Sequence, residues 1–243
     1  VVDWVVVMKQ LDERLLGLNV LARGELTAEK IESVVDLLVP FYQAAKTGPG
    51  VEEFGSIATV KFNTDENFEQ TADFVDLAIP AAVYEALKNF TNRFYVEREE
   101  LFQRRISEGW AREIHGDLHL GNIFFEKPPV IFDCIEFNDR LRCGDVAVDL
   151  GFLVMDLDFQ GLPDLARRVV ERYVQKSGDV DFLDLVDFYA CYRAYVRGKI
   201  ACFTSRDPAV DAAGRAAQLE LATRYFQLAH DYATGGGHGK DVK

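Results

Sequence analysis

The sequence predicts a mainly α-helical fold that also contains a short β-hairpin. Apolar residues recur at helical spacing over most of the chain, in the ranges 31–42, 71–108, 163–175, 183–203 and 208–232. Two short apolar runs, Asn122–Phe125 and Val130–Asp133, are typical of strands, and Glu126–Pro129 joins them as a turn. A length of 243 residues is enough for one large domain or two small ones with a sizeable core.

The N-terminal third is predicted to contain a strand, a helix and an irregular segment. Val1–Lys9 is β-branched and continuous, which predicts a strand. Thr27 is a suitable N-cap for the first long helix, in which Pro40 is expected to produce a kink or a break. The breaker at residues 47–50 ends this helix, and the mixed polar residues 51–70 predict an irregular segment.

The rest of the chain is predicted to be helical on either side of the hairpin. Pro80 interrupts the helical pattern of residues 71–108, and the aromatic residues in that pattern are expected in the core. The glycine-rich residues 235–239 begin a predicted flexible tail or linker that continues to residue 243.

Composition excludes several classes of protein. The net charge of −13 argues against a groove for nucleic acid and against binding to an anionic membrane surface. The sequence contains no apolar run long enough to cross a membrane and no basic region ahead of an apolar stretch. We therefore expect a cytoplasmic protein. Its four scattered cysteines are expected to be reduced and largely buried, and they are Cys134, Cys143, Cys191 and Cys202.

Three polar residues around the hairpin are the candidate active site. Asp117 and Asn122 lie within the stretch HGDLHLGN, and Asp133 ends the second strand of the hairpin. The first residue of one antiparallel strand lies beside the last residue of the other, so Asn122 and Asp133 are expected to meet. An Asp that orients a hydroxyl, with an Asn and an Asp that bind a divalent metal, are the groups that phosphoryl transfer requires.

Three blocks in this order, HGDLHLGN, IFDCIEF and GDVAVDL, resemble the aminoglycoside phosphotransferase family of the protein-kinase-like superfamily. The wider stretches HGDLHLGNIFF, IFDCIEFNDRLRCGD and YRAYVRGK resemble a bacterial subgroup in which this domain precedes a P-loop ATP-binding domain. The P-loop motif itself does not occur in this sequence, so that domain is expected outside this chain.

The resemblance implies the large, mainly helical lobe of a kinase-like fold, with most of the small lobe missing. Residues 1–12 would be the last strand of the small lobe and the hinge, residues 13–234 the helical lobe, and residues 235–243 the tail. The fragment would then lack the loop that covers the phosphates and the lysine that binds them, and whether it is active alone is left open.

By the same resemblance, the adenine of ATP would meet the hinge at Met8, Lys9 and Gln10, and Phe124 and Phe132 would line the floor of its pocket. A rival interpretation makes Lys9 the strand lysine that pairs with phosphates. We disfavour it because no helix with a partner Glu, followed by further strands, separates Lys9 from the helical region.

The resemblance also suggests roles for the polar residues. Asp117 would act as the catalytic base, and Asn122 and Asp133 would bind Mg²⁺, which accepts few protein ligands. The role of Glu136 is left open. It could reach the metal or a cationic substrate, or it could be a surface charge. Structural support is expected from Asp145 and from Asp149, which would tie the following helix to the catalytic loop. Arg193, Arg197 and Lys199 lie on one predicted helix and are expected to face solvent rather than the cleft, which is the alternative.

The two histidines of the motif allow two interpretations. His115 is expected to be a scaffold residue that bonds to backbone near the site. The alternative is a zinc site formed by His115, Asp117 and His119 on alternate positions of a strand, although the glycines nearby favour a loop.

The leading hypothesis is an enzyme that uses ATP and Mg²⁺ to phosphorylate a hydroxyl group of a small molecule. Aminoglycosides, choline-like compounds, sugars and amino alcohols all fit this core. The alternative is a kinase-like binding or regulatory module that acts with a neighbouring P-loop domain. A metal hydrolase is a third hypothesis, and it predicts bound zinc without dependence on a nucleotide.

Overall fold

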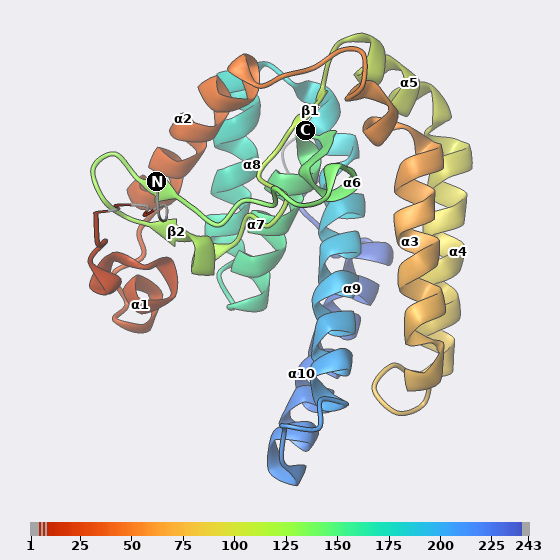
Figure 1. The fold of residues 1–243 in the computed structure, drawn as a ribbon. Helices are drawn as coiled ribbons and strands as arrows, with labels where there is room; N and C mark the ends of the chain where they lie inside the picture. Colours follow the sequence, from red (N-terminus) through yellow and green to blue (C-terminus); the bar gives the residue numbers. More distant parts are fainter. Residues whose placement is uncertain (1–4, 6, 8, 240–243) are drawn as a thin grey trace.

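Helix α7, Ala147–Phe159, lies at the centre of the fold, and almost all of its side chains are buried. The computed structural model describes residues 5, 7 and 9–239. Helices α8, Pro163–Ser177, and α9, Val186–Ser205, pack on α7, and α10, Ala212–Ala233, runs beside α9 (Figure 1). The other helices cover this central group on two sides.

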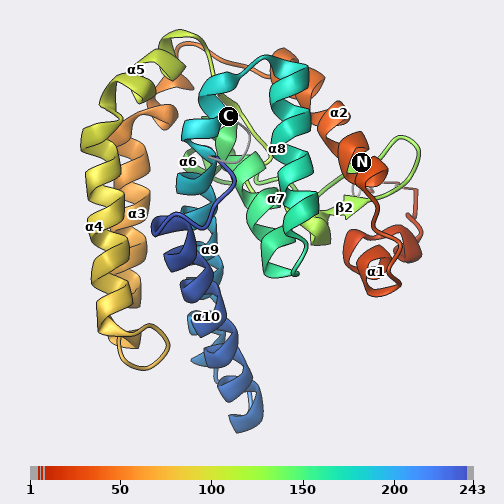
Figure 2. The same cartoon turned by 180° about the vertical axis from the view of Figure 1, so that it is seen from behind.

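The N-terminal helices form two separate walls. Helix α1, Gly17–Ala22, and helix α2, Ala28–Ala44, lie on one side, where α2 packs against α8. Helices α3, Ile57–Thr71, and α4, Ala81–Glu97, form a pair on the other side, as the view from behind shows (Figure 2). Helix α5, Glu99–Ser107, leads from this pair back to the centre. None of the described helices is both long and apolar enough to span a membrane.

Two small antiparallel sheets connect these helices. Strand β1, Ala111–Glu113, pairs with β4, Cys143–Asp145, and β2, Ile123–Phe124, pairs with β3, Val130–Ile131. Helix α6, Asp139–Arg142, comes directly before β4. The predicted mainly helical fold with a short hairpin is therefore confirmed.

Helix α3 corrects the prediction of an irregular segment at residues 51–70. Its buried face includes Val60, Thr64 and Phe68, which are four residues apart, and Ser56 caps its first turn. The buried Thr64 and Thr71 hydroxyls bond to the hydroxyls of tyrosines in α4 and α9. Because part of this face is polar, a pattern based on apolar residues does not reveal the helix.

Two other predictions concern the first helix and the first strand. Thr27 caps α2 as predicted, and α2 continues through Pro40 without a break. Most of the predicted strand Val1–Lys9 lies outside the described residues. Val5, Val7 and Lys9 are described, and the structure assigns none of the three to a strand.

Gly151 allows the two central helices to approach closely. A Cβ atom at this position would lie 2.8 Å from the Tyr189 Cβ and 3.0 Å from the Ala190 backbone nitrogen, both in α9. Such distances are shorter than carbon atoms tolerate, so a larger residue would push α9 away from α7.

A buried ion cluster joins α5 to the central helices. Arg105 is 1% exposed, and its guanidinium binds the carboxylates of both Asp145 and Asp179 through paired hydrogen bonds of 2.5–2.9 Å. Asp145 also accepts the Ala147 N–H at the start of α7, and Asp179 accepts the Tyr173 hydroxyl. The structural role predicted for Asp145 is therefore explained by this cluster.

The residues after α10 fold back onto the start of α9. Residues 235–239 were expected instead to begin a flexible tail. The buried His238 ring bonds to the Asp158 carboxylate at 2.8 Å, and its backbone N–H donates to Asp187. Burial lowers the pKa of His238, but the hydrogen bond and the charges of Asp158 and Asp187 outweigh burial and raise it above its ordinary value.

Replacing Arg105 by Met should lower the free energy of unfolding by about 3–5 kcal/mol, because two buried carboxylates lose their cation. The matched control is Arg104→Met, whose solvent-exposed ion pair with Asp181 should contribute little to stability. Denaturant unfolding at pH 7 measures both. Equal losses of unfolding free energy in the two variants would show that the buried cluster stabilises the fold no more than an exposed ion pair does.

The stability contribution of His238 should depend on pH. A histidine whose pKa is raised by folding stabilises the fold fully below its unfolded pKa of about 6.5, and this contribution is lost as the pH rises through the folded value. Thermal unfolding of the wild type and of His238→Asn should therefore differ more at pH 6 than at pH 9. A difference that grows towards pH 9 would contradict this linkage.

Candidate functional site

The buried carboxylate of Asp149 holds the start of the candidate catalytic loop, residues 115–122. It accepts the backbone N–H groups of His115 at 2.7 Å and Gly116 at 2.8 Å, and the Tyr42 hydroxyl at 3.1 Å. The structural role that the sequence suggested for Asp149 matches this geometry. Complete burial raises the pKa of Asp149, against the opposing effect of His115 and the backbone donors.

Gly116 is required at the sharp turn of this loop. Its φ angle is +84°, and a Cβ atom would lie 2.6 Å from the Leu141 carbonyl oxygen. Both facts exclude a larger residue, since L side chains rarely adopt this conformation and the backbone of the next segment occupies the space. The turn therefore directs Asp117 away from the buried Asp149.

His115 is a scaffold residue, as predicted from the sequence. Its Nε2 atom lies 2.8 Å from the Phe132 carbonyl oxygen, and its Nδ1 atom accepts the Asp117 N–H at 3.3 Å. The ring thus joins the catalytic loop to the segment that carries Asp133. Both ring nitrogens have backbone partners, so the geometry does not favour the zinc arrangement.

Asp117 lies at the surface of the loop with one carboxylate oxygen held in place. Its Oδ2 atom accepts a hydrogen bond from Asn122 Nδ2 at 3.1 Å and lies 3.4 Å from His119 Nε2. No described residue bonds to Oδ1. Since the side chain is 39% exposed, this oxygen is open to a reactant.

The surroundings of Asp117 keep its carboxyl ionised. Burial alone would raise the pKa of Asp117, but His119 and the guanidinium groups of Arg193 and Arg197 outweigh that effect and lower it. The group is therefore a carboxylate at neutral pH, in the state that can accept a proton.

Asn122 and Asp133 lie at the same end of the hairpin, where β2 begins and β3 ends. The Phe132 N–H donates to the Asn122 carbonyl at 3.1 Å, so Asp133 follows directly after this bond. The Asn122 amide donates to Asp117, which leaves its Oδ1 atom facing away from Asp117. Asp133 is exposed and has a φ angle of +60°, a conformation in which its backbone turns out of the strand.

These residues fit a magnesium ion better than a softer metal. Asn122 and Asp133 together offer one amide oxygen and one carboxylate, the hard ligands that Mg²⁺ accepts alongside water and phosphate oxygens. Among the residues that the structure describes, no group of three or more His, Cys, Asp and Glu side chains is placed to hold a metal. Phosphate oxygens would have to complete the coordination.

Of the residues expected around the adenine, Lys9, Gln10, Phe124 and Phe132 are described, and Phe124 and Phe132 lie in or next to the hairpin strands. The Phe124 and Phe132 rings are 5.2 Å apart, and Phe132 is 40% exposed. Lys9 forms an ion pair with Glu126 in the hairpin turn, at 3.2 Å. Gln10 is exposed, and Met8 lies outside the described residues.

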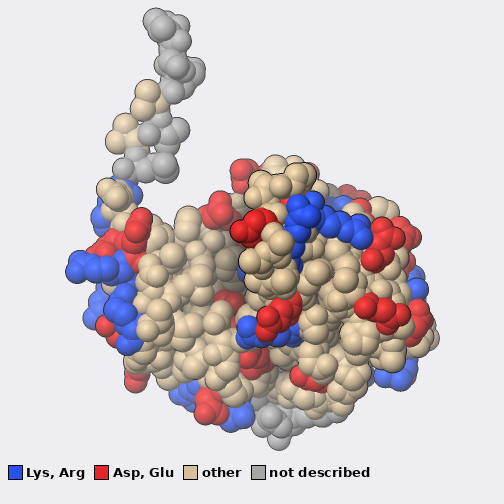
Figure 3. Space-filling model, turned by 90° about the horizontal axis from the view of Figure 1, so that it is seen from below, with Lys and Arg blue, Asp and Glu red and all other residues tan. Residues whose placement is uncertain are grey.

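A cavity of about 480 Å³ lies between α2 and the segment after β3, and His115 is among its lining residues. It is lined mainly by apolar side chains, including Leu38, Phe41 and Ile135, together with Glu136 and Arg142. Glu136, whose role was left open, is exposed and borders this cavity. The face seen from below is also hollowed near its middle, and its charged groups lie around broad uncharged areas (Figure 3).

Two residues that hold the loop were missed by the sequence analysis. Asp156, two turns after Asp149 in α7, accepts the Leu120 N–H at 2.8 Å. Arg193 was expected in solvent, but it is 5% exposed and donates to the Gly116 carbonyl at 2.7 Å. The spacing of Asp149 and Asp156 along one helix face was the available signal for the first, and the apolar residues around Arg193 were a signal for the second.

Comparison with known proteins identifies the family of this chain. The model of the APH phosphotransferase enzyme family matches residues 45–185, which include Asp117, Asn122 and Asp133. Uncharacterized proteins from Mycobacterium bovis and from two strains of Mycobacterium tuberculosis are each 31% identical over 227 residues. That alignment covers 93% of this chain and 46% of each relative.

The chain thus spans about half the length of the curated relatives it matches. No solved structure gives a significant match. The family model covers more than half of the 243 residues, and it coincides with a mainly helical kinase-like fold around the catalytic loop. The chain belongs to the APH phosphotransferase enzyme family.

Proposed function

We propose that this chain carries the catalytic residues of a kinase that transfers the γ-phosphoryl group of ATP to a hydroxyl of a small molecule. The observation that carries the proposal is the position of Asp117. Its carboxyl is ionised and partly exposed to solvent, and the amide of Asn122 holds one of its oxygens. Membership of the phosphotransferase family supports the reaction class.

In the proposed reaction, Asp117 Oδ1 accepts a hydrogen bond from the acceptor hydroxyl and directs its oxygen towards the γ-phosphorus. A bond forms between this oxygen and phosphorus as the bond from phosphorus to the bridging oxygen of ADP breaks. The hydroxyl proton passes to Asp117. The rigid loop contributes by holding the carboxylate in one orientation, which reduces the entropy that the reaction must lose.

Asn122 Oδ1 and the Asp133 carboxylate would hold Mg²⁺ at the end of the hairpin. The ion would neutralise charge on the phosphate oxygens. The Asn122 side chain, which would hold the ion, also donates to Asp117, so the proposed metal ligand and the proposed base are held in one fixed relation.

We further propose that Phe124 and Phe132 line the adenine pocket and that residues 1–12, including Met8, Lys9 and Gln10, form the hinge. The paired aromatic rings and the ion pair of Lys9 with the hairpin turn support this arrangement. In this division, residues 13–234 are the helical lobe and the rest of the small lobe lies outside the chain. The relatives are about twice as long, which leaves room for it and for a P-loop domain.

A kinase-like binding module that acts with a P-loop domain is the second candidate. The partial coverage of the relatives is the observation that favours it. The intact set of Asp117, Asn122 and Asp133 favours the enzyme, because a module without catalysis has no need for an open carboxylate beside two oxygen ligands.

Replacing Asp117 by Asn should reduce turnover by at least about 100-fold, since the general base contributes about 10²–10⁴-fold. Affinity for Mg-ATP should stay nearly unchanged, because Asp117 is not a proposed metal ligand. Steady-state kinetics and calorimetry measure the two quantities, and Asp164→Asn, at an exposed ion pair in α8, is the matched control. A large loss of thermal stability in Asp117→Asn, without a specific loss of turnover, would make Asp117 a structural residue.

Calorimetric titration of Mg-ATP should separate the enzyme from the module. The chain extended upstream through the small lobe should bind, and Asp133→Asn in that protein should weaken binding through loss of the metal ligand. Titration of the present chain shows whether hinge, metal ligands and aromatic floor suffice alone. Absence of binding in both lengths would remove the main support for the kinase and favour the module.

A further inference from the structure

A small cavity lies between α3, the sheet of β1 and β4, and α9. Its volume is about 20 Å³, and it borders Ile114, the residue directly before the catalytic loop. Asn63 of α3 and Tyr189 and Arg193 of α9 also line it. Tyr189 and Arg193 are four residues apart and lie on the same face of α9. This cavity, the Arg193 cavity, therefore receives polar side chains from two helices.

Three buried polar atoms of these residues have no hydrogen-bond partner among the described residues. They are Asn63 Oδ1, the Tyr189 hydroxyl and Arg193 Nε. Six buried side-chain atoms of this kind occur in the described part of the chain, so half of them belong to residues that line one small cavity. Buried polar groups in proteins are almost always hydrogen-bonded, and this concentration indicates one shared partner.

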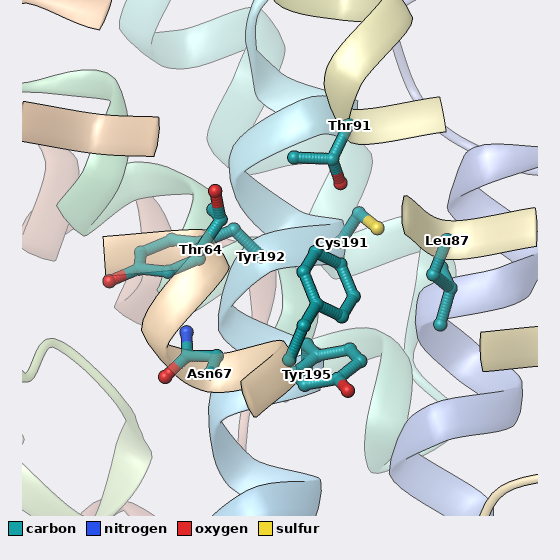
Figure 4. Close-up of a pocket in the computed structure, with 8 residues that line it drawn as sticks. Thr64, Asn67, Leu87, Thr91, Cys191, Tyr192 and Tyr195 are labelled. Carbon is teal, nitrogen blue, oxygen red and sulfur yellow. The ribbon is translucent and has the colours of Figure 1, made fainter. Parts of the chain in front are cut away.

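A neighbouring cavity of about 10 Å³ shows the opposite pattern. It lies between α3, α4 and α9, where Thr64, Asn67 and Tyr195 are among its lining residues (Figure 4). Thr64 bonds to a tyrosine of α4, Tyr195 bonds to a threonine of α3, and Asn67 accepts a lysine of α9. None of the six atoms without a partner belongs to a described residue that lines this cavity. Its polar side chains therefore give no sign of a ligand.

The three atoms of the Arg193 cavity match one water molecule. Arg193 Nε carries a hydrogen and only donates, Asn63 Oδ1 only accepts, and the Tyr189 hydroxyl does either. A water molecule accepts the first, donates to the second and bonds to the third, which gives the number of bonds typical of a buried water. The volume of about 20 Å³ is sufficient, because one water needs about 10–15 Å³.

Ions fit the same three atoms less well. An anion would accept from Arg193 and Tyr189, but it would be repelled by the oxygen of Asn63. A cation would suit that oxygen and be repelled by the guanidinium. Burial raises the pKa of Tyr189 well above its ordinary value, so the hydroxyl keeps its proton and adds no negative charge.

Arg193 connects the cavity to the catalytic loop. The residue is 5% exposed, and its Nη2 atom donates to the Gly116 carbonyl at 2.7 Å. A guanidinium held at one nitrogen alone is able to rotate about that bond, whereas a second bond at Nε fixes the plane of the group. A partner for Nε would therefore also fix the direction of the bond to Gly116.

We propose that one ordered water molecule occupies the Arg193 cavity and bridges Asn63, Tyr189 and Arg193. The bridge makes Arg193 a positioning residue of the catalytic loop and connects the loop to α3. It does not depend on the reaction proposed above, because it concerns only how the loop is supported.

Water–protein NOE measurements by NMR on this chain test the bridge directly. The Arg193 Nε–H proton should show a cross-peak to a long-lived water molecule. The Nε–H of Arg105 is the matched control, because it donates to Asp145 in the buried ion cluster and should show none. Absence of the cross-peak at Arg193, or an equal one at Arg105, would overturn the proposal.

Two further samples identify the source of this signal. In Tyr189→Phe the cross-peak should remain, because two partners still hold the water and no hydroxyl proton is present to relay the signal. Its disappearance there would assign the signal to the hydroxyl and contradict the bridge. Added chloride should leave the cross-peak unchanged. Its loss, together with a shift of the Arg193 signal, would show that an anion occupies the cavity.

The stability of Tyr189→Phe provides an independent test. Loss of a hydroxyl that is bonded to water should raise the equilibrium constant for unfolding about fivefold. Loss of a hydroxyl without any partner would leave this constant unchanged or lower it, and that result would refute the bridge. Tyr192→Phe is the control, because Tyr192 lines the same cavity but is only half-buried, and it should change the constant little. Denaturant unfolding measures both.

A double-mutant cycle tests whether α3 shares the water with α9. The effect of Asn63→Leu combined with Tyr189→Phe on the unfolding constant should depart at least about twofold from the product of the single effects. Asn67→Leu, one turn further along α3 at the neighbouring cavity, should combine with Tyr189→Phe without such coupling. Independent effects in both pairs would mean that Asn63 and Tyr189 share no partner.

Hydrogen exchange tests the positioning role of Arg193. The amide N–H groups of His115 and Gly116, which bond to Asp149, report on the start of the loop. Tyr189→Phe should increase their exchange rates by a larger factor than the unfolding constant, whereas the amides of α10 should follow that constant. Equal factors at both places would contradict a positioning role.

Discussion

The bonds from Asp149 to two consecutive backbone N–H groups determine the shape of the catalytic loop. They fix His115 and Gly116 on the buried side, so the turn at Gly116 presents Asp117 on the open side. A carboxylate that accepts two N–H groups holds a chain more rigidly than a single bond, because rotation about either bond breaks the other. The orientation of Asp117 therefore originates in a residue that does not touch a reactant.

Helix α7 is the rigid support to which the whole loop is attached. Asp149 binds the beginning of the loop and Asp156 binds Leu120 near its end, so two positions about two turns apart match the length of the loop. Gly151, between them, lets α9 approach α7 closely enough for Arg193 to reach the Gly116 carbonyl. The same short segment of α7 therefore determines both how closely α9 packs and where the site lies.

The sequence predicted the parts of the site that are formed by residues close together in the chain. The hairpin, with Asn122 and Asp133 at one end, follows from two apolar runs close in sequence, whereas the structural role of Asp149 was implied by the family resemblance. Helix α3 was missed because its buried face includes Thr64 and Thr71, which are satisfied by tyrosines distant in sequence. The apolar neighbours of Arg193 indicate that it is buried, but its partner, the backbone carbonyl of the distant Gly116, has no signal in the sequence. Contacts between distant segments decide both cases.

The ionised state of Asp117 limits what this carboxylate is able to do. His119, Arg193 and Arg197 make it a weaker proton acceptor than an ordinary aspartate, because they stabilise its negative charge. A weak acceptor cannot remove a proton from an alcohol before the alcohol oxygen has begun to bond to phosphorus and become acidic. In the proposed reaction, proton transfer must then follow bond formation, and the nucleophile is a neutral hydroxyl rather than an alkoxide. This order suits a loose transition state, in which the attacking oxygen carries little charge until late.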